Sequence, residues 1–571
     1  MKQKFQNLKT PFAKNAKDAW SIYPRPQMQR ASYLPLCGDW SFYVRKSNAC
    51  IPLGKINVPF PPESMLSGIM RTPEKHGKYL YKKIFTVEKA FLDERVLLHF
   101  GAVDQIARVT LNGNCLREHV GGYLPFSFDV TDAVHCGENE LCVEVTDEID
   151  TDIPYGKQRH DRGGMWYTPI SGIWQTVWME SVPTEYLRHL RITPTVNSVT
   201  IVCEGGADEK LLQIETPHGT ETYRFTGDTI TVTVKEPRLW TPETPYLYYF
   251  SLTSGKDTVR SYFALRTITV GRANGRDLLL LNGKPYFFHG LLDQGYFSDG
   301  IYLPASPDGF RYDIETMKSL GFNTLRKHIK IEPECFYYDC DRLGMIVFQD
   351  MVNSGPYHFL IDTALPTVGL KRGISHHASP RRREIFESHA RETVTHLYNH
   401  PCVCYYTVFN EGWGQYDADR IYGELRTLDP TRIYDATSGW FTKKESDVRS
   451  EHIYFKKLRF KDGNRPLVLS EFGGYSCKLP QHAFNLDKTY GYRFFETEEQ
   501  LQDALEHLYL DEVIPAIREK GLCAAILTQV SDVEDETNGL VTYDRRRVKV
   551  SPERMQRIAD ALYKTFGECF G

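Results

Sequence analysis

The chain has 571 residues, which is too long for one compact core and predicts two to four domains. Hydrophobic residues make up 41% and charged residues 25% of the chain, as in ordinary folded proteins, whereas aromatic residues are numerous at 13%. The 69 basic and 73 acidic residues leave a net charge of -4, so the positive field of a nucleic-acid-binding protein is missing and no nucleic acid partner is expected.

The first residues, MKQKFQNLKTPFAKNAKDAW, include basic side chains but lack the apolar stretch of a signal peptide, and no run of about 18 apolar residues follows. We therefore expect neither secretion nor insertion into a membrane. The 13 cysteines contain no CxxC pair, and Cys402 and Cys404 stand two apart in an apolar run. Free thiols in a reducing cytoplasm are favoured over a disulfide framework or a zinc site.

Short alternating strands separated by turn residues fill residues 40–182, as in WSFYV, KYLYKKIFTV, LPFSFDVT and ELCVEVTD. Strands at this spacing predict an antiparallel β-sandwich or jelly roll, and Asn112-Gly113 is a good two-residue hairpin turn. The strand pattern continues through residues 183–270, with a proline-containing joint at Trp240-Thr241-Pro242. We expect a jelly-roll domain over residues 1–182 and a second, smaller sandwich over residues 183–270.

After Gly271 the pattern changes to apolar strand-like runs that alternate with helical stretches, which is typical of parallel βα units. Eight strands are expected, at residues 286–289, 324–328, 345–350, 402–410, 433–438, 452–455, 467–471 and 524–529. Helices are expected at residues 309–320, 333–343, 381–398, 416–428 and 497–520. This alternation predicts a (β/α)8 TIM barrel over residues 271–571, with catalytic groups at the carboxyl ends of its strands. Residues 433–471 leave little room for helices between three strands.

Two of the predicted strands end in a glutamate followed by glycine. Residues 405–414 read YYTVFNEGWG and deliver Asn410 and Glu411 to the place where the strand stops. Residues 466–474 read PLVLSEFGG and do the same for Glu471. One such glutamate is more often a capping or surface residue, but two in one barrel indicate catalysis. Two carboxylates about 5 to 5.5 Å apart hydrolyse glycosides with retention of configuration. One attacks the anomeric carbon while the other protonates the leaving oxygen, so the first needs a low pKa and the second a raised pKa.

The sequence resembles glycoside hydrolase family 2, the family of β-galactosidases, β-glucuronidases and β-mannosidases, over nearly its whole length. GAVD at residues 101–104 and GGYLPF at 121–126 look like that family's sugar-binding-type jelly roll, and GGMW at 163–166 like its end. NGKP at residues 282–285 resembles the start of the family's barrel, and GFNTLR at 321–326 its second strand. The resemblance implies an immunoglobulin-like second sandwich and a retaining glycosidase. For this chain we expect neither a cofactor nor a metal.

By this likeness Asn410-Glu411 is the acid/base motif and Ser470-Glu471 the nucleophile motif. Arg326 matches an arginine that lies close to the nucleophile, where its charge would keep Glu471 ionised, although a purely structural salt bridge is equally compatible. Asn410 has amide donors for a sugar hydroxyl.

Further sugar contacts are expected from strand ends, each weighed against an ordinary capping or packing role. These candidates are Asp293, Gln294, Asp350, Tyr454, Trp413 and Trp440. Tyr454 stands where related barrels carry a tyrosine that donates to the nucleophile, and the two tryptophans would form sugar platforms. His328, His358, His376 and His377 are expected to be solvated or hydrogen-bonded, since no spacing such as HExxH supports a metal site.

Departures from the family pattern bear on the substrate. The β-glucuronidases compared carry an Asn-x-Lys element that holds the sugar carboxylate, whereas residues 537–540 read TNGL without the lysine, which disfavours a uronic acid. The large β-galactosidases of the family carry magnesium ligands after the third strand, and residues 350–355 do not reproduce them. Those enzymes also have a tryptophan at the end of the eighth strand, which residues 528–532 lack, so the floor of the sugar subsite is expected to differ.

These features favour a cytoplasmic, exo-acting, β-galactosidase-like enzyme that hydrolyses small glycosides or oligosaccharides. A β-glucuronidase or other β-hexuronidase, a β-mannosidase and an α-L-arabinopyranosidase stay open, because a few loop contacts decide the sugar. A silent carbohydrate-binding protein on the same fold also stays open, though it would not need two facing carboxylates. A homo-oligomer is compatible with the sequence. Residues 158–166, a polar and glycine-rich run that fits no strand, are the candidate for a loop that lines the barrel.

Overall fold

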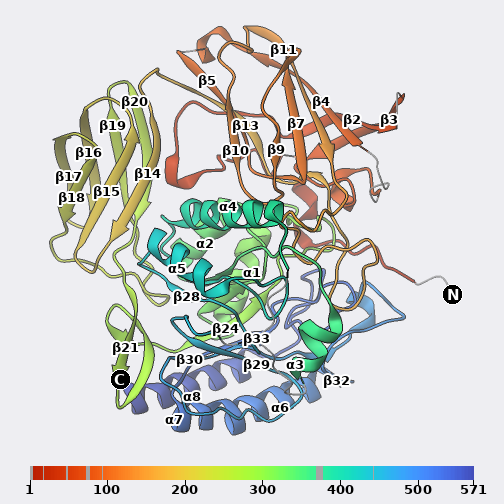
Figure 1. Cartoon of the computed structure of the whole chain (residues 1–571), viewed down its shortest axis with the longest axis vertical. Helices are drawn as coiled ribbons and strands as arrows, with labels where there is room; N and C mark the ends of the chain where they lie inside the picture. The colour runs from red at the N-terminus through yellow and green to blue at the C-terminus, as the bar shows by residue number, and fades with distance from the viewer. Residues whose placement is uncertain are drawn as a thin grey trace.

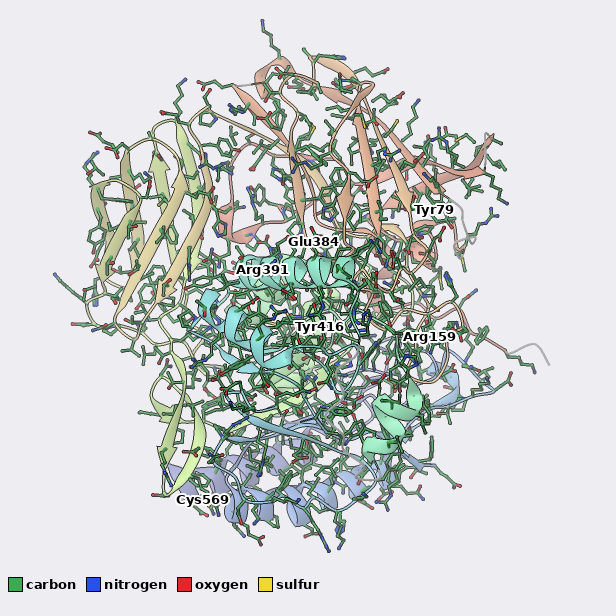
Figure 2. All side chains as sticks on the ribbon, in the orientation of Figure 1. Tyr79, Arg159, Glu384, Arg391, Tyr416 and Cys569 are labelled. Atoms are coloured by element: carbon green, nitrogen blue, oxygen red, sulfur yellow. The ribbon has the colours of Figure 1, made fainter. Side chains whose placement is uncertain are left out.

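The computed structural model describes residues 4–16, 18–46, 49–71, 78–92, 94–367, 377–441 and 443–571. A sandwich built from the first third of the chain lies at one end of the molecule, a second sandwich lies beside it, and the barrel fills the rest (Figure 1). Side chains fill the space between these layers (Figure 2). Within the described ranges, no helix combines the length and the apolar character needed to cross a bilayer.

The first sandwich encloses one apolar core between two antiparallel sheets. One sheet has the order β1 (Leu34–Pro35), β13 (Val177–Val182), β5 (Arg95–Phe100), β10 (Phe126–Asp129). The other contains β3 (Ala49–Val58), β2 (Gly38–Lys46), β4 (Lys78–Val87), β11 (Gly137–Thr146), β7 (Ile106–Leu111), β8 (Asn114–Cys115) and β9 (His119–Val120). A short pair, β6 (Val103–Asp104) and β12 (Gly172–Ile173), completes it. The predicted turn joins β7 to β8, with positive φ at Asn112 and Gly113 as a type I′ turn requires.

The second sandwich has two smaller sheets around its own core. One contains β14 (Leu187–Pro194), β15 (Ser198–Gly205) and β18 (Thr229–Thr233), and the other β17 (Gly219–Thr226), β16 (Glu209–Thr216), β19 (Tyr248–Ser254) and β20 (Asp257–Phe263). The proline-containing joint ties this domain to the barrel, because the fully buried indole of Trp240 donates to the carbonyl of Asp341 at 2.7 Å. A hairpin of β21 (Ile268–Ala273), β22 (Arg276–Leu281) and β23 (Lys284–Pro285) then leads into the barrel.

All eight predicted barrel strands lie in one parallel sheet. Its order is β28 (Ile433–Asp435), β27 (Val403–Thr407), β26 (Ile346–Asp350), β25 (Thr324–Lys327), β24 (Phe288–Asp293), β33 (Leu522–Thr528), β30 (Leu467–Gly473), β29 (Arg449–Ile453). Its strands are buried nearly throughout, as a sheet covered on both faces requires. Among the described residues no helix joins β28 to β29 or β29 to β30, and the sheet stays unpaired between β28 and β29. The short connections expected at residues 433–471 are therefore present.

Helices cover the outside of the barrel. They are α1 (Asp308–Ser319), α2 (Glu334–Leu343), α3 (Leu365–Thr367), α4 (Pro380–Leu397), α5 (Ala418–Leu428), α6 (Glu498–Leu508), α7 (Ile514–Lys520) and α8 (Pro552–Phe570). The helix predicted over residues 497–520 is divided into α6 and α7 by a π-helical turn, η7 (Tyr509–Val513). Short helical turns occur at η1 (Pro11–Asn15), η2 (Pro26–Met28), η3 (Met65–Ser67), η4 (Lys89–Phe91), η5 (Leu360–Ala364) and η6 (Pro480–His482). A parallel pair, β31 (Tyr475–Cys477) and β32 (Arg493–Phe495), lies after β30.

The segment between β11 and β12 leaves the first sandwich and packs on the barrel. The amide of Tyr155 donates to the carbonyl of Asn353 at 3.1 Å. The amide of Thr168 donates to the Glu534 carboxylate at 3.0 Å. This connection brings residues 157–168 to the carboxyl ends of the strands, where the sequence placed a candidate lining loop.

Candidate active site

A cavity of about 260 Å³ opens at the carboxyl ends of the barrel strands. Seven residues expected at the site line it: Gln294, Asn410, Glu411, Trp413, Trp440, Tyr454 and Glu471. Lys157 and Met165 of the first sandwich line it as well, so two domains build it. A larger cavity of about 1030 Å³ lies between the second sandwich and the barrel, but none of the expected site residues lines it. Chemistry rather than volume therefore identifies the site.

Glu471, on β30, is held by two donors. Nη1 of Arg326, on β25, donates to Oε1 of Glu471 at 2.9 Å and to the carbonyl of Ser470 at 3.0 Å. The hydroxyl of Tyr454 donates to Oε2. Burial raises the pKa of Glu471, but the neighbouring His452 and Arg326 more than offset this effect and bring the pKa to about 2. Glu471 is therefore ionised throughout the neutral range.

Glu411 directly faces Glu471 but lies in a different electrostatic environment. It follows β27 with a left-handed φ of 54°, which turns its side chain into the cavity at the strand end. Burial raises the pKa of Glu411, and the negative charge of Glu471 raises it further, whereas His452 opposes the shift. The pair thus has one low and one raised pKa, as an acid and a nucleophile require.

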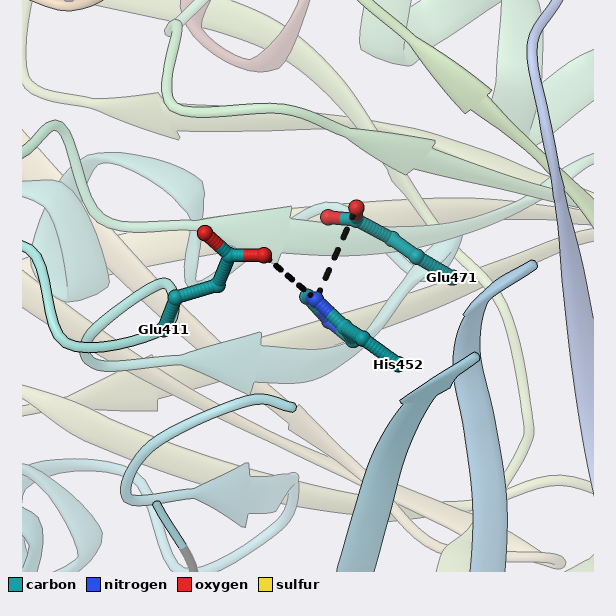
Figure 3. A group of neighbouring side chains, drawn as sticks. All are labelled: Glu411, His452 and Glu471. Atoms are coloured by element: carbon teal, nitrogen blue, oxygen red, sulfur yellow. Dashed lines mark hydrogen bonds and ion pairs between the residues drawn. The ribbon is translucent and has the colours of Figure 1, made fainter. Parts of the chain in front are cut away.

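His452, on β29, lies between the two carboxylates (Figure 3). Its Nδ1 is 2.9 Å from Oε1 of Glu411 and 3.6 Å from Oε2 of Glu471. Its Nε2 is 3.4 Å from Nη1 of Arg326, and because a guanidinium only donates, Nε2 must accept. The proton is therefore assigned to Nδ1, which donates to Glu411. His452 was not predicted as a site residue, because a single histidine on a short strand belongs to no motif of recognisable spacing.

Within the described residues, Glu411, His452 and Glu471 also lie close enough together to hold a metal ion. One possible ligand atom of each lies within 4.8 Å of the others. The proton on Nδ1 of His452 removes its lone pair, and Arg326 and Tyr454 already occupy the oxygens of Glu471. This donor set fits a shared proton better than a cation.

Of the other histidines, His328 also lines the cavity; it is buried, and its Nδ1 lies 2.9 Å from Oδ2 of Asp350. His358 and His377 are exposed. His376 lies outside the described residues.

Asp293 and Asp350 were predicted to contact the sugar, but neither of them lines the cavity. The two oxygens of Asp350 accept from Nε of Arg326 at 3.0 Å and pair with His328. Asp293 pairs with Nζ of Lys327 at 2.7 Å and accepts from the amide of Gly295 at 2.9 Å. Both carboxylates therefore neutralise buried cations beneath the site, which the sequence could not show because the partners lie on other strands or in loops.

Asn410 directs its amide donors to the cavity, because its Oδ1 accepts from Arg326 and from the hydroxyl of Ser438, both at 2.9 Å. The indole of Trp440 donates to the carbonyl of His452 at 3.0 Å.

Trp413 and Tyr454 are each fixed by an aromatic neighbour. The ring of Trp413 packs edge-on against Trp166 of the first sandwich, with centroids 4.7 Å apart. Tyr454 stacks on Tyr492, with centroids 3.8 Å apart. Both residues therefore combine packing with a place in the cavity lining.

Replacing His452 by phenylalanine is expected to move both limbs of the pH profile upward by about one unit. The variant removes the Nδ1–H that donates to Glu411 and lies 3.6 Å from Oε2 of Glu471, and since His452 lowers the pKa of both glutamates, both pKa values rise. A hydrogen bond to a charged group contributes roughly 1.5–3 kcal/mol, and one pKa unit corresponds to about 1.4 kcal/mol. The measurement is the pH dependence of kcat/KM for a nitrophenyl glycoside that the wild type hydrolyses.

His452→Asn is the matched control, because its amide retains a donor and should shift the profile less. An unchanged alkaline limb in a folded His452→Phe variant would remove His452 from the proton network.

Three family models match the chain. They are the glycosyl hydrolase 2 galactose-binding domain-like model over residues 54–176, the glycosyl hydrolases family 2 model over residues 191–266, and the family's TIM barrel domain over residues 274–478. Together they cover well over half of the chain.

Among curated relatives, a β-galactosidase of Thermoanaerobacter pseudethanolicus is 25% identical over 62% of this chain and 47% of its own length. A putative β-glucuronidase of Formosa agariphila is 24% identical over 68% of this chain and 37% of its own length, so the chain spans less than half of these two proteins. A β-glucuronidase of Streptococcus agalactiae is 23% identical over 86% of this chain and 91% of its own length.

The solved structure of a β-D-glucuronidase from Dictyoglomus thermophilum matches with a TM-score of 0.76 and 20% identity, over 94% of this chain and 98% of that one. This likeness confirms the predicted fold of two β-sandwiches and a TIM barrel. The three family models confirm the resemblance inferred from the motifs, and the chain belongs to glycoside hydrolase family 2.

Proposed function

We propose that the chain is a retaining β-glycosidase in which Glu471 is the nucleophile and Glu411 the acid/base. The observation that supports this most directly is that one carboxylate oxygen of each lies within 4.8 Å of the other. Retaining enzymes hold their carboxyl groups about 5 to 5.5 Å apart, whereas inverting enzymes leave about 6.5 to 9.5 Å for a water molecule.

In the first step, the ionised Glu471 attacks the anomeric carbon while Glu411 gives its proton to the oxygen that leaves with the aglycone. The sugar is then bound to Glu471 as an ester, and Glu411 is a carboxylate stabilised by Nδ1–H of His452. In the second step, Glu411 takes a proton from water, whose oxygen attacks the anomeric carbon and releases Glu471.

The shape of the cavity supports an exo-acting enzyme. Its volume of about 260 Å³ is below the range of roughly 300–1,000 Å³ that is common for pockets of drug-sized ligands. Lys157 and Met165 of the first sandwich reach it from outside the barrel. A terminal sugar fits such a site better than an internal unit of a polymer.

The sequence favoured a β-galactoside as substrate, and relatives named β-galactosidase and β-glucuronidase both occur. A β-galactoside and a β-hexuronide are accordingly the two substrate classes considered. A silent binding protein is disfavoured, because the two glutamates have opposite pKa shifts suited to catalysis. We also propose a cytoplasmic location, which the free state of all 13 cysteines supports.

Glu471→Gln is expected to leave the fold intact and to lower kcat by about 10⁴-fold or more, because an amide cannot form the glycosyl-enzyme. The measurement is the rate of nitrophenol release together with the thermal unfolding midpoint. Equal rates in the variant and the wild type would exclude Glu471 as the nucleophile.

Glu411→Ala is expected to spare glycosides with good leaving groups, because these need little protonation. For poor leaving groups we expect kcat/KM to fall by about 10² to 10⁴-fold. External azide should partly restore turnover of activated substrates. A variant that slowed activated and unactivated aglycones equally would contradict the acid/base role.

A further inference from the structure

Lys157 is a cationic side chain in the active-site cavity, and no carboxylate among the described residues pairs with it. It belongs to the segment between β11 and β12, and it lines the cavity beside Met165. Across the described ranges of the chain, its ammonium forms neither a hydrogen bond nor an ion pair. Its Nζ lies 5.6 Å from the ring centroid of Tyr167. An ammonium has three donors to satisfy, so a bound ligand is the natural partner.

Several buried cations of the barrel are already neutralised. Each pairs with a carboxylate: Arg326 with Glu471 and Asp350, Lys327 with Asp293, Lys330 with Glu332, Lys549 with Asp532, and Arg545 with Asp313. Of the three lysines among them, Lys549 lies closest in sequence to residues 537–540, where the family's lysine is absent, but its donors go to Asp532 and to two carbonyls. Lys157 therefore differs from these cations in being available.

The segment that carries Lys157 is held rigidly. The carbonyl of Lys157 accepts from the amide of Tyr167 at 3.0 Å. The buried amide of Gln158 donates to Asp104 and accepts from the amide of Ile170, both at 2.7 Å. Farther along the segment, Arg162 pairs with Glu534 of the barrel at 3.0 Å. A lysine on such a base loses little backbone entropy when it binds a ligand.

The charge of Lys157 reaches buried groups of the cavity. Phe359 and Phe455 are each 64% exposed and mark the open side of the cavity, whereas Gln294 and Glu536 are only 4% and 3% exposed. Burial raises the pKa of Glu536, and the charge that opposes this shift most is that of Lys157. The pKa of His328 is lowered to about 4, mainly by burial and next by the charge of Lys157. The charge of Lys157 thus acts on Glu536 and His328, two buried groups that line the same cavity.

We propose that Lys157 binds a carboxylate on the terminal sugar, so that the preferred substrates are β-hexuronides. This inference rests on the proposed glycosidase function. It replaces the expectation drawn from the missing Asn-x-Lys lysine, because the cation comes from a different domain. A single ammonium matches the charge of a carboxylate, whereas a phosphate would bring a charge of about -1.5 to -2 and three acceptor oxygens.

The test compares kcat/KM of the full chain for nitrophenyl β-glucuronide, β-galacturonide, β-galactoside and 6-phospho-β-galactoside. We expect at least one hexuronide to exceed the neutral galactoside by tenfold or more. Lys157→Met keeps the length of the side chain and removes its charge, so the ratio of hexuronide to galactoside should fall at least tenfold, mainly through KM. The ratio cancels any effect of Lys157 on Glu411 that both substrates share.

Lys157→Arg keeps the positive charge and should retain most of the ratio of hexuronide to galactoside. This variant therefore distinguishes the loss of the charge from misfolding of the segment. Arg159→Met is the matched control, since Arg159, labelled in Figure 2, stands on the same segment, pairs with Asp161 at 3.3 Å and does not line the cavity. It should leave the ratio unchanged. Hydrolysis of the galactoside with an unaltered ratio in Lys157→Met, or a preference for the phosphorylated sugar, would overturn the inference and leave the glycosidase intact. Failure to hydrolyse any of the four would overturn both.

Discussion

The buried guanidinium of Arg326 organises the active site. From its position on β25 it donates to Asp350 at the end of β26, to Asn410 after β27 and to Glu471 on β30. Only 1% of its surface is exposed, so these charge-assisted hydrogen bonds lie in a medium of low dielectric constant, where they are strong. One cation thereby fixes the nucleophile, its charge state and the residue that precedes the acid.

The chemical difference between two identical side chains follows from this arrangement. Glu471 lies beside Arg326 and Tyr454, whereas Glu411 lacks a cationic partner at ion-pair distance other than the shared His452 among the described residues. Burial acts on both carboxyls, but the opposing charges are concentrated on one side. The barrel thus supplies an ionised carboxylate and a carboxylic acid across one small cavity.

The fold and the two glutamates were predictable because both depend on local patterns. An apolar run followed by a glutamate and a glycine turn marks a strand end whatever the remainder of the chain does. Eight apolar runs that alternate with helical stretches predict a barrel. His452 and Lys157 carried no comparable signal, since their proximity to the glutamates depends on β29 and on a segment of another domain. The partners of Asp293 and Asp350 escaped prediction for the same reason: each is set by long-range packing. The segment at residues 158–166 stood out only by failing to fit a strand.

The stereochemistry of hydrolysis distinguishes a double displacement through Glu471 from a single displacement by water. When the chain hydrolyses a β-glycoside in an NMR tube, the anomeric proton of the first product reports the configuration before mutarotation. The geometry of Glu411 and Glu471 predicts that the β-anomer appears first and the α-anomer only later. An initial α-anomer would show inversion through a single displacement by water, and the assignment of Glu471 as a nucleophile would be wrong.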